Sequence, residues 1–426
     1  MKALASLLTA RRLRFWGAAL LVLGWGVHIH TMSTPGLVDR VGRFKGSDYT
    51  QFYVMGSLAR EGRLGSLYDP AAHLEAGRAR IDAGLALYSA HPNYGPQVAL
   101  AFMPLAALPY AASLALFLIL SAFCYACAVW LVWRECAALR PHGRLVALLA
   151  AASPLFLTVV RYGQASAFAL LALSLAFVAL RRNRPVLGGL AIGCLAYKPQ
   201  LGIVIGAAIL MARQWRVVAG AALAVAAQAV IAIAAAGWTT SGQYAAELWR
   251  LSLDPSLVQL YPSEVHSIRG FIQLLAPAAP LVALGTALGL AVSLAAAIRS
   301  WSTPSSIGVR WGLLIVLTIL ASPHLLTYDL VLLTLPLLVA ADWALQHPEH
   351  ERSAGIRTAL ALLYFAPFSA MIVARLTSVQ MSVVVMAALA WRMYQVSVDS
   401  RAMVAPRWEF ASSQNSTTRG WRSSAA

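Results

Sequence analysis

Carboxylate side chains are scarce in this chain. Asp and Glu together number 16 among 426 residues, against 33 Lys and Arg, and charged residues of both signs make up only 12%. Hydrophobic residues account for 60% of the chain, and its mean hydropathy is +0.69. A protein of this length cannot bury so much apolar surface in an aqueous fold, which excludes a soluble globular protein.

Cysteine is also rare, with four in the chain. Cys124 and Cys127 have Cys-x-x-Cys spacing, but they lie inside one apolar run, which indicates small packing residues and not a redox or zinc site. His28 and His30 are two residues apart, do not share a helix face, and have no other metal-binding residue at ligand spacing. We therefore expect no metal site.

Several catalytic motifs are absent. The chain has no Walker motif, no glycine-rich nucleotide loop, no Gly-x-Ser-x-Gly and no His-Glu-x-x-His. A cytoplasmic site for ATP or a nucleotide sugar therefore has no support. The net charge of +17 does not indicate nucleic acid, because the arginines sit in short loops and are not interleaved with aromatic side chains that would stack bases.

The main feature of the chain is a series of long apolar runs. Their length, roughly 17 to 24 residues, suits helices that cross a bilayer, and we predict an all-α polytopic membrane protein with about twelve such helices. The predicted spans cover about residues 15–33, 110–133, 145–160, 165–180, two short pieces within 186–212, 217–236, 278–298, 311–326, 328–345, 357–374 and 379–396. Basic residues before the first run put the N-terminus in the cytoplasm.

The domain organisation follows from these runs. Residues 1–398 form one membrane domain with two outer loops, 34–96 and 237–277, and residues 399–426 form a cytoplasmic tail that we expect to be disordered. Inward loops are short and basic, whereas the outward loops are large. The chemistry should therefore lie on the outer side of the membrane.

Asp48 is the first candidate catalytic residue, because it follows the first span directly. Apolar and aromatic side chains recur at helical spacing between Tyr49 and Gly62, which predicts an amphipathic helix lying on the membrane surface. Asp48 would stand at the N-terminus of this helix, either as a cap, as a catalytic carboxylate or as both. Asp69, in Tyr68-Asp69-Pro70, is expected to cap a second helix that begins at about residue 71.

Two cations lie near the outer ends of predicted spans. Lys198 precedes Pro199 at the tip of a short hairpin, where an ammonium group is tolerated if it meets an anion such as a phosphate. Arg161 stands at an outward turn, followed by Gly163 and by Gln164, which can hydrogen-bond a sugar or phosphate. The alternative for both cations is a side chain that reaches the headgroups from a helix end.

The segment from Ser322 to Asp329 lies where two predicted spans meet. His324 and Tyr328 are four residues apart and would share a helix face. A buried structural histidine is the alternative to a functional one. Asp329 is then either its partner or a second carboxylate.

Taken in order, these segments resemble glycosyltransferase family 87, whose members have the GT-C membrane fold. The matching pieces are Ser47-Asp48-Tyr49 to Tyr53, Leu67-Tyr68-Asp69, Tyr94-Gly95-Pro96 with Met103-Pro104-Leu105, Gly163-Gln164, Gly188-Gly189-Leu190 leading to Lys198-Pro199, and Ser322-Pro323-His324 with Tyr328. They span most of residues 40 to 340 in family order.

The resemblance implies a GT-C-type transferase of the plasma (inner) membrane. Such an enzyme moves a sugar, mannose or arabinofuranose in known members, from a polyprenyl-phosphate carrier to a lipid-linked or glycan acceptor on the extracytoplasmic face. Asp48 would be the general base, and His324 would organise the site. The expected substrate-binding residues are Tyr49, Tyr53, Tyr94, Arg161, Gln164, Lys198, Tyr328 and Asp329. No cofactor, metal or nucleic acid is expected.

Two other functions remain compatible with a polytopic chain. A lipid or sugar transporter or flippase would favour internal repeats and polar residues at the midplane, neither of which is clear here. A non-catalytic scaffold of the cell envelope would not depend on the charges of Lys198 and Arg161.

Overall fold

The computed structural model describes residues 8–82, 84, 93–253 and 261–399 of the chain. Within these ranges the regular elements are all helical. The α-helices are α2 (Ala10–Met32), α3 (Tyr49–Arg60), α4 (Pro70–Arg80), α5 (Pro96–Phe102), α6 (Tyr110–Glu135), α7 (Gly143–Ala151), α8 (Pro154–Tyr162), α9 (Ser166–Arg181), α10 (Pro185–Gly193), α11 (Pro199–Met211), α12 (Trp215–Leu253), α13 (Ile268–Leu275), α14 (Ala279–Trp301), α15 (Ile307–Ala321), α16 (Thr334–Gln346), α17 (Ser353–Thr377) and α18 (Met381–Val398). The predicted disordered tail lies outside the described residues, apart from residue 399.

Among the described residues, seven helices are long and apolar enough to cross a membrane, or eight if the bent helix α17 is one span. Helices α9, α11 and α15 and the stretch Pro185–Tyr197 are apolar but shorter, so the predicted count of about twelve spans is not confirmed. Only 6% of the apolar window of α2 and 11% of that of α14 is buried. Apolar faces left this open are suited to lipid, and the chain is a multi-pass membrane protein.

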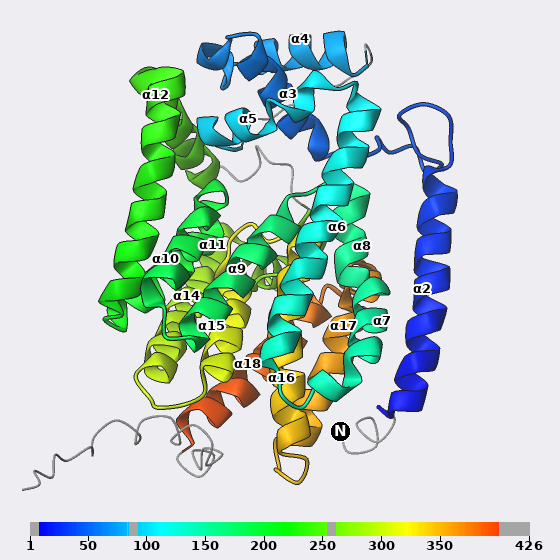
Figure 1. Cartoon of the computed structure of the whole chain (residues 1–426), viewed down its shortest axis with the longest axis vertical. Coiled ribbons are helices and arrows are strands. Elements are labelled where there is room, and N and C mark those ends of the chain that lie inside the picture. Colours follow the sequence, from blue (N-terminus) through cyan, green and yellow to red (C-terminus); the bar gives the residue numbers. More distant parts are fainter. Residues whose placement is uncertain (1–7, 83, 85–92, 254–260, 400–426) are drawn as a thin grey trace, which may run out of the picture.

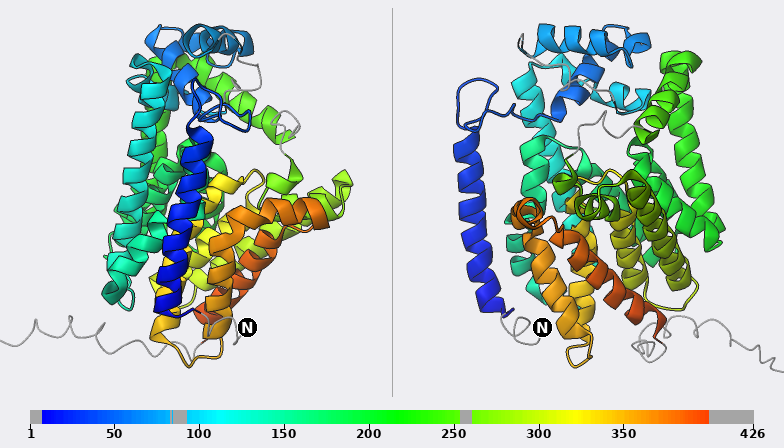
Figure 2. Two further views of the ribbon diagram at one scale, coloured as in Figure 1. Left: turned by 90° about the vertical axis from the view of Figure 1, so that its right-hand side faces the viewer. Right: turned by 180° about the vertical axis from the view of Figure 1, so that it is seen from behind.

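The helices form a long bundle with a layer across one end. Figure 1 shows α3, α4 and α5 in that layer, above the bundle of α6 to α11, while α2 begins at the opposite end. The view from behind in Figure 2 shows α14 to α18 as a second group, with α2 standing at the side of the molecule. Helix α6 joins the layer to the bundle.

Helix α3 differs from the predicted amphipathic surface helix. Ten of its 12 residues, from Tyr49 to Ala59 with Gln51 excepted, are buried. Phe52 stacks on Phe102 of α5 with ring centroids 4.7 Å apart. The prediction placed the polar face in water, whereas Gly56 lets Phe102 at the end of α5 and Ala106 in the following 3-10 segment approach that face closely.

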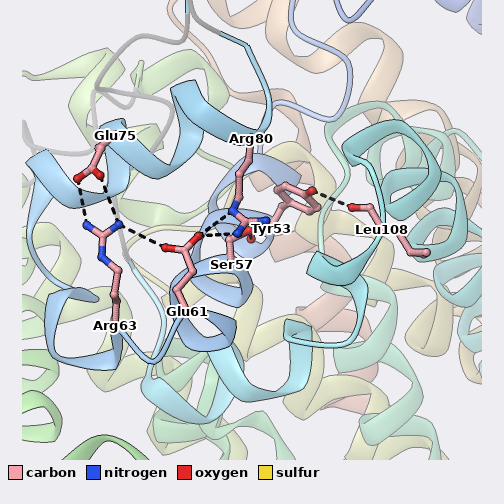
Figure 3. Close-up of polar contacts among 7 residues, drawn as sticks. All are labelled: Tyr53, Ser57, Glu61, Arg63, Glu75, Arg80 and Leu108. Atoms are coloured by element: carbon pink, nitrogen blue, oxygen red, sulfur yellow. Dashed lines mark hydrogen bonds and ion pairs between the residues drawn. The ribbon is translucent and has the colours of Figure 1, made fainter.

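Polar contacts fix the far end of α3 to α4 and to the start of α6. Glu61 pairs with Arg80 at 2.7 Å and with Arg63 at 3.3 Å, and Arg63 also pairs with Glu75 (Figure 3). The Tyr53 hydroxyl donates to the backbone oxygen of Leu108 at 2.8 Å. These contacts hold α3 against α4 and against the segment before α6. Asp48, which directly precedes α3, therefore has a fixed position.

The predicted second outer loop is partly helical. Helix α12 continues to Leu253 through a break at Gly237, whose φ of +81° lies in the region that glycine tolerates best. Residues 254–260 lie outside the described part. The chain then passes through Pro262–Glu264, a 3-10 turn, into α13.

Candidate active site

Two glycines bring the segment before α3 onto the end of α8. Gly46 has a φ of +65° and Gly163 a φ of +70°. A Cβ on Gly163 would lie 2.8 Å from the Cβ of Tyr49, so no larger residue fits there without a shift. The Asp48 amide donates to the Tyr162 carbonyl at 3.0 Å. The turn after α8 therefore determines where Asp48 stands.

The Asp48 carboxylate accepts hydrogen bonds from three side chains. Ser47 Oγ donates to Oδ1 at 3.1 Å, Gln164 Nε2 donates to Oδ2 at 2.9 Å, and the Tyr328 hydroxyl is a third donor. Burial raises the pKa of Asp48, and these hydrogen bonds and the charge of Lys198 offset part of that rise. A carboxylate with a raised pKa is a better match for proton abstraction near neutral pH.

The side chain of Asp48 does not cap α3. Asp48 occupies the N-cap position, but its carboxylate makes no cap hydrogen bond to the helix. Asp69 behaves as predicted, because it accepts from the Ala71 amide at 2.9 Å at the start of α4. Of the two roles expected for Asp48, capping is therefore excluded by this geometry.

Gln164 is buried and its amide has one orientation that satisfies its neighbours. Its Oε1 accepts from the Ala165 amide at 3.1 Å and from the Tyr94 hydroxyl at 3.4 Å. Nε2 is thereby left to donate to Asp48. Tyr94 and Gln164, both expected in the site, form one chain of hydrogen bonds that ends on the carboxylate.

A buried ion pair lies next to this chain. Lys198 Nζ is 2.6 Å from Asp329 Oδ1, and the two side chains are 3% and 4% exposed. Ser166 Oγ is 3.0 Å from Lys198 Nζ and 2.5 Å from Asp329 Oδ1. The ammonium group also lies 5.2 Å from the ring centroid of Tyr328. The pair thus supports the ring whose hydroxyl donates to Asp48.

His324 is not helical, contrary to the prediction that it shares a helix face with Tyr328. Helix α15 ends at Ala321 because Ser322 precedes Pro323 and takes an extended conformation. Tyr328 lies beyond, in the 3-10 segment Thr327–Leu333. Burial, followed by the charge of Arg269, lowers the pKa of His324 to about 4. His324 is therefore neutral at physiological pH.

Three expected site residues lie outside the cluster around Asp48. Tyr49 is fully buried, with its hydroxyl 2.5 Å from Ser113 Oγ. The Tyr53 hydroxyl donates a hydrogen bond to the backbone oxygen of Leu108. Both belong to an aromatic core that positions the start of α3. Arg161 is exposed on the last turn of α8. Their substrate-binding roles remain predictions.

Some residues of the site were missed from the sequence. Ser166 links Lys198 to Asp329, although an isolated serine in an apolar run gives no signal. His266 and Arg269 lie in the segment that was predicted as the second outer loop, beside residues 322–328. A histidine close to an isolated arginine was their signal in the sequence. No cluster of three or more His, Cys, Asp or Glu suited to a metal occurs among the described residues.

A hollow of about 850 Å³ lies at the other end of the α7–α8 pair. Arg14, Arg140 and Arg144 are among its lining residues, so it belongs to the basic end of the bundle. It is separate from the Asp48 cluster, which meets the opposite end of α8 at Tyr162. We therefore assign the site from the hydrogen-bonded cluster and not from this hollow.

Comparison with curated proteins and with solved structures gives no match. The sequence model described as Glycosyltransferase family 87 matches residues 93–323. This region contains Tyr94, Gln164 and Lys198, while Asp48 and Tyr328 lie outside it. It covers more than half of the chain. This chain belongs to glycosyltransferase family 87 and is a membrane glycosyltransferase.

Proposed function

We propose that the chain transfers a sugar, most simply mannose, from a polyprenyl-phosphate carrier to a lipid-linked or glycan acceptor. In this proposal Asp48 is the general base, and transfer takes place on the extracytoplasmic face of the plasma (inner) membrane. The observation that carries the proposal is the Asp48 carboxylate, held by Gln164, Tyr328 and Ser47 where burial raises its pKa.

The proposed reaction is a single displacement. The acceptor hydroxyl attacks the anomeric carbon while Asp48 takes its proton. A bond forms between the acceptor oxygen and that carbon, and the bond from the carbon to the phosphate oxygen breaks. The electron pair leaves with the phosphate, so the configuration at the anomeric carbon inverts. A phosphate is already a good leaving group, and the proposal requires no cofactor or metal.

The proposed side of the membrane is supported by charge. Arginines gather near the C-terminal ends of α6 and α9, which Figure 1 shows at the same end of the bundle as the start of α2. Such residues favour the cytoplasmic side. The layer of α3, α4 and α5 lies at the opposite end, and Asp48 directly precedes α3.

The test is transfer from labelled polyprenyl-phosphate mannose in proteoliposomes that hold the wild-type chain or Asp48→Asn. We expect the variant to lose at least about 100-fold in rate, because proton abstraction of this kind contributes 10²- to 10⁴-fold. Asp39→Asn is the matched control, since Asp39 bonds to backbone amides in the loop before Asp48.

Full transfer by a folded Asp48→Asn chain would remove Asp48 as the base. Movement of intact donor across the bilayer without a covalent product would instead favour the transporter or flippase. Family membership already favours the transferase.

A further inference from the structure

Arg269 is a cation without a carboxylate partner in the described part of the chain. It is the second residue of α13, and its Nη1 lies 3.5 Å from the backbone oxygen of Pro323. The side chain is half-buried, and burial lowers the pKa of its guanidinium group. An arginine stays charged even so, and a partly desolvated charge favours an anionic ligand.

Ser267 and His324 lie next to a short antiparallel contact between two segments. Val265 forms a bridge with Leu326, and the His266 amide donates to the Leu325 carbonyl at 2.8 Å. Ser267 follows His266 directly and His324 precedes Leu325 directly, so both residues adjoin this contact. Arg269 lies one turn beyond, where the first amides of α13 are not used within the helix.

The side chain of His266 fixes this contact. Its Nδ1 lies 2.8 Å from Ser382 Oγ and its Nε2 lies 2.9 Å from Thr327 Oγ1. Thr327 directly precedes Tyr328, which donates to Asp48. The segment from residue 322 to 328 therefore carries Asp48's partner at one end and the Arg269 contact at the other.

Three polar atoms around this contact have no hydrogen-bond partner within the described ranges. They are Ser267 Oγ, Ser322 Oγ and His324 Nδ1, and all three are buried. Both serines are fully buried. Buried polar atoms in native proteins are nearly always satisfied, so several unsatisfied atoms beside one unpaired arginine indicate a missing polar ligand.

The other candidate cations are less suited to an anion. Lys198 is 3% exposed, and Asp329 already neutralises its charge at 2.6 Å. Arg161 is exposed, where water screens its charge. Arg269 combines a free charge with partial burial, and it lies beside the segment that reaches Asp48.

We propose that Arg269, His324, Ser267 and Ser322 form the subsite for the phosphate of the polyprenyl-phosphate donor. This inference rests on the proposed function and replaces Lys198 and Arg161 as the partners of the phosphate. Arg269 holds the leaving group, and its charge stabilises the negative charge that develops when the sugar departs. His324 and Tyr328 are four residues apart, so their Cα atoms are separated by at most about 14 Å, and the subsite adjoins the segment that reaches Asp48.

The experiment measures the donor KM and product inhibition in proteoliposomes for Arg269→Gln. Loss of a charge-assisted hydrogen bond should raise the donor KM about 10- to 100-fold and weaken inhibition by polyprenyl phosphate by a similar factor. Ser267→Ala should raise the donor KM several-fold with less risk to folding. The acceptor KM should stay unchanged in both variants.

Arg375→Gln is the matched control. Arg375 lies near the same loop, but Glu264 pairs with it at 3.4 Å, so its removal should leave the donor KM unchanged. Inorganic phosphate and polyprenol are the comparison inhibitors. If Arg269→Gln weakens inhibition by inorganic phosphate but leaves inhibition by polyprenyl phosphate unchanged, the site binds free phosphate and the assignment to the lipid carrier is overturned.

Two outcomes separate this inference from the proposed function. If Asp48→Asn abolishes transfer while Arg269→Gln and Ser267→Ala keep the wild-type donor KM, the subsite is wrong and the function stands. If the wild-type chain gives no transfer, binding is read from thermal stabilisation by polyprenyl phosphate. Stabilisation of wild-type and Arg375→Gln chains but not of Arg269→Gln supports the subsite, and equal stabilisation of all three overturns it.

Discussion

Gln164 Nε2 donates to Asp48 Oδ2 at 2.9 Å, and the two residues are 116 positions apart in the chain. The Ala165 amide and the Tyr94 hydroxyl both donate hydrogen bonds to the side-chain oxygen of Gln164, so its NH2 group faces the Asp48 carboxylate. Gln164 can therefore act only as a donor to Asp48. Such a donor favours the ionised carboxylate and opposes the effect of burial on the pKa.

Replacement of Gln164 by Met should shift the pH dependence of transfer. Asp48 must be ionised to act as base, so activity falls as the pH drops through its pKa. Removal of the hydrogen bond raises that pKa further, and the acid limb of kcat/KM should move upward by about one to two units. Activity at high pH should be retained. The measurement is a pH–rate profile of the wild type and Gln164→Met.

Gln97→Met is a suitable control, since Gln97 lies on α5 and makes no hydrogen bond to Asp48. Its profile should coincide with that of the wild type. An acid limb that stays in place in Gln164→Met would mean that the titrating group is not Asp48.

The buried pair of Lys198 and Asp329 predicts a marked asymmetry between single and double variants. Lys198→Met leaves Asp329 buried without a counter-charge, which should cost about 3–5 kcal/mol of stability. Lys198→Met combined with Asp329→Asn should recover most of that loss, because no unpaired charge remains. Thermal unfolding in detergent measures both.

A partly exposed pair supplies the comparison. Arg250 and Glu247 of α12 are in contact at 2.7 Å with side chains 51% and 14% exposed, and Glu247→Gln should change stability by less than about 1 kcal/mol. If the double variant is as unstable as Lys198→Met, the pair does more than balance charge. A raised donor KM in a stable double variant would restore Lys198 as a phosphate ligand.

Much of the helical architecture could be predicted from apolar length. The runs near residues 110–133, 278–298 and 379–396 correspond to α6, α14 and α18. The number of spans could not be obtained in this way. Helices such as α9 and α15 are apolar yet too short to be spans by length alone, and tertiary packing decides their depth.

Several residues that were expected in one site lie together in the structure, but their pairings could not be predicted. Asp48, Gln164 and Tyr328 were expected in the site, and the structure joins them by hydrogen bonds. Lys198 was expected to face a phosphate, but its partner Asp329 is 131 residues away and no local pattern specifies that contact. His324 was predicted on a helix, but Ser322 before Pro323 takes an extended conformation and α15 ends at Ala321.

Removal of divalent metal should leave transfer unchanged. The proposed reaction stabilises the leaving phosphate with protein cations, so the rate in EDTA should equal the rate in added Mg²⁺ or Mn²⁺ within about twofold, a difference of ~0.4 kcal/mol. The measurement is transfer by metal-stripped proteoliposomes with and without each ion. A rate that collapses in EDTA and returns with one ion would require a metal in the site.

Gly163→Ala should damage both folding and catalysis through the turn that places Asp48. The residue has a φ of +70°, and an added Cβ would lie 2.8 Å from Tyr49 Cβ and 3.2 Å from Gly46 Cα. The left-handed backbone costs about 1 kcal/mol for alanine, and the overlap pushes the 46–49 segment off α8. Since the Asp48 amide bonds to the Tyr162 carbonyl, kcat should fall more than stability explains.

Gly206→Ala separates this effect from a general intolerance of added side chains. Gly206 lies within α11, and no atom outside its own helix stands within 4 Å of the position of its Cβ. Alanine there should keep or raise stability by up to about 1 kcal/mol, with activity unchanged. Wild-type kcat in Gly163→Ala would show that the approach of the two glycines does not position the base, whereas a loss confined to Gly163→Ala ties the turn after α8 to the chemistry at Asp48.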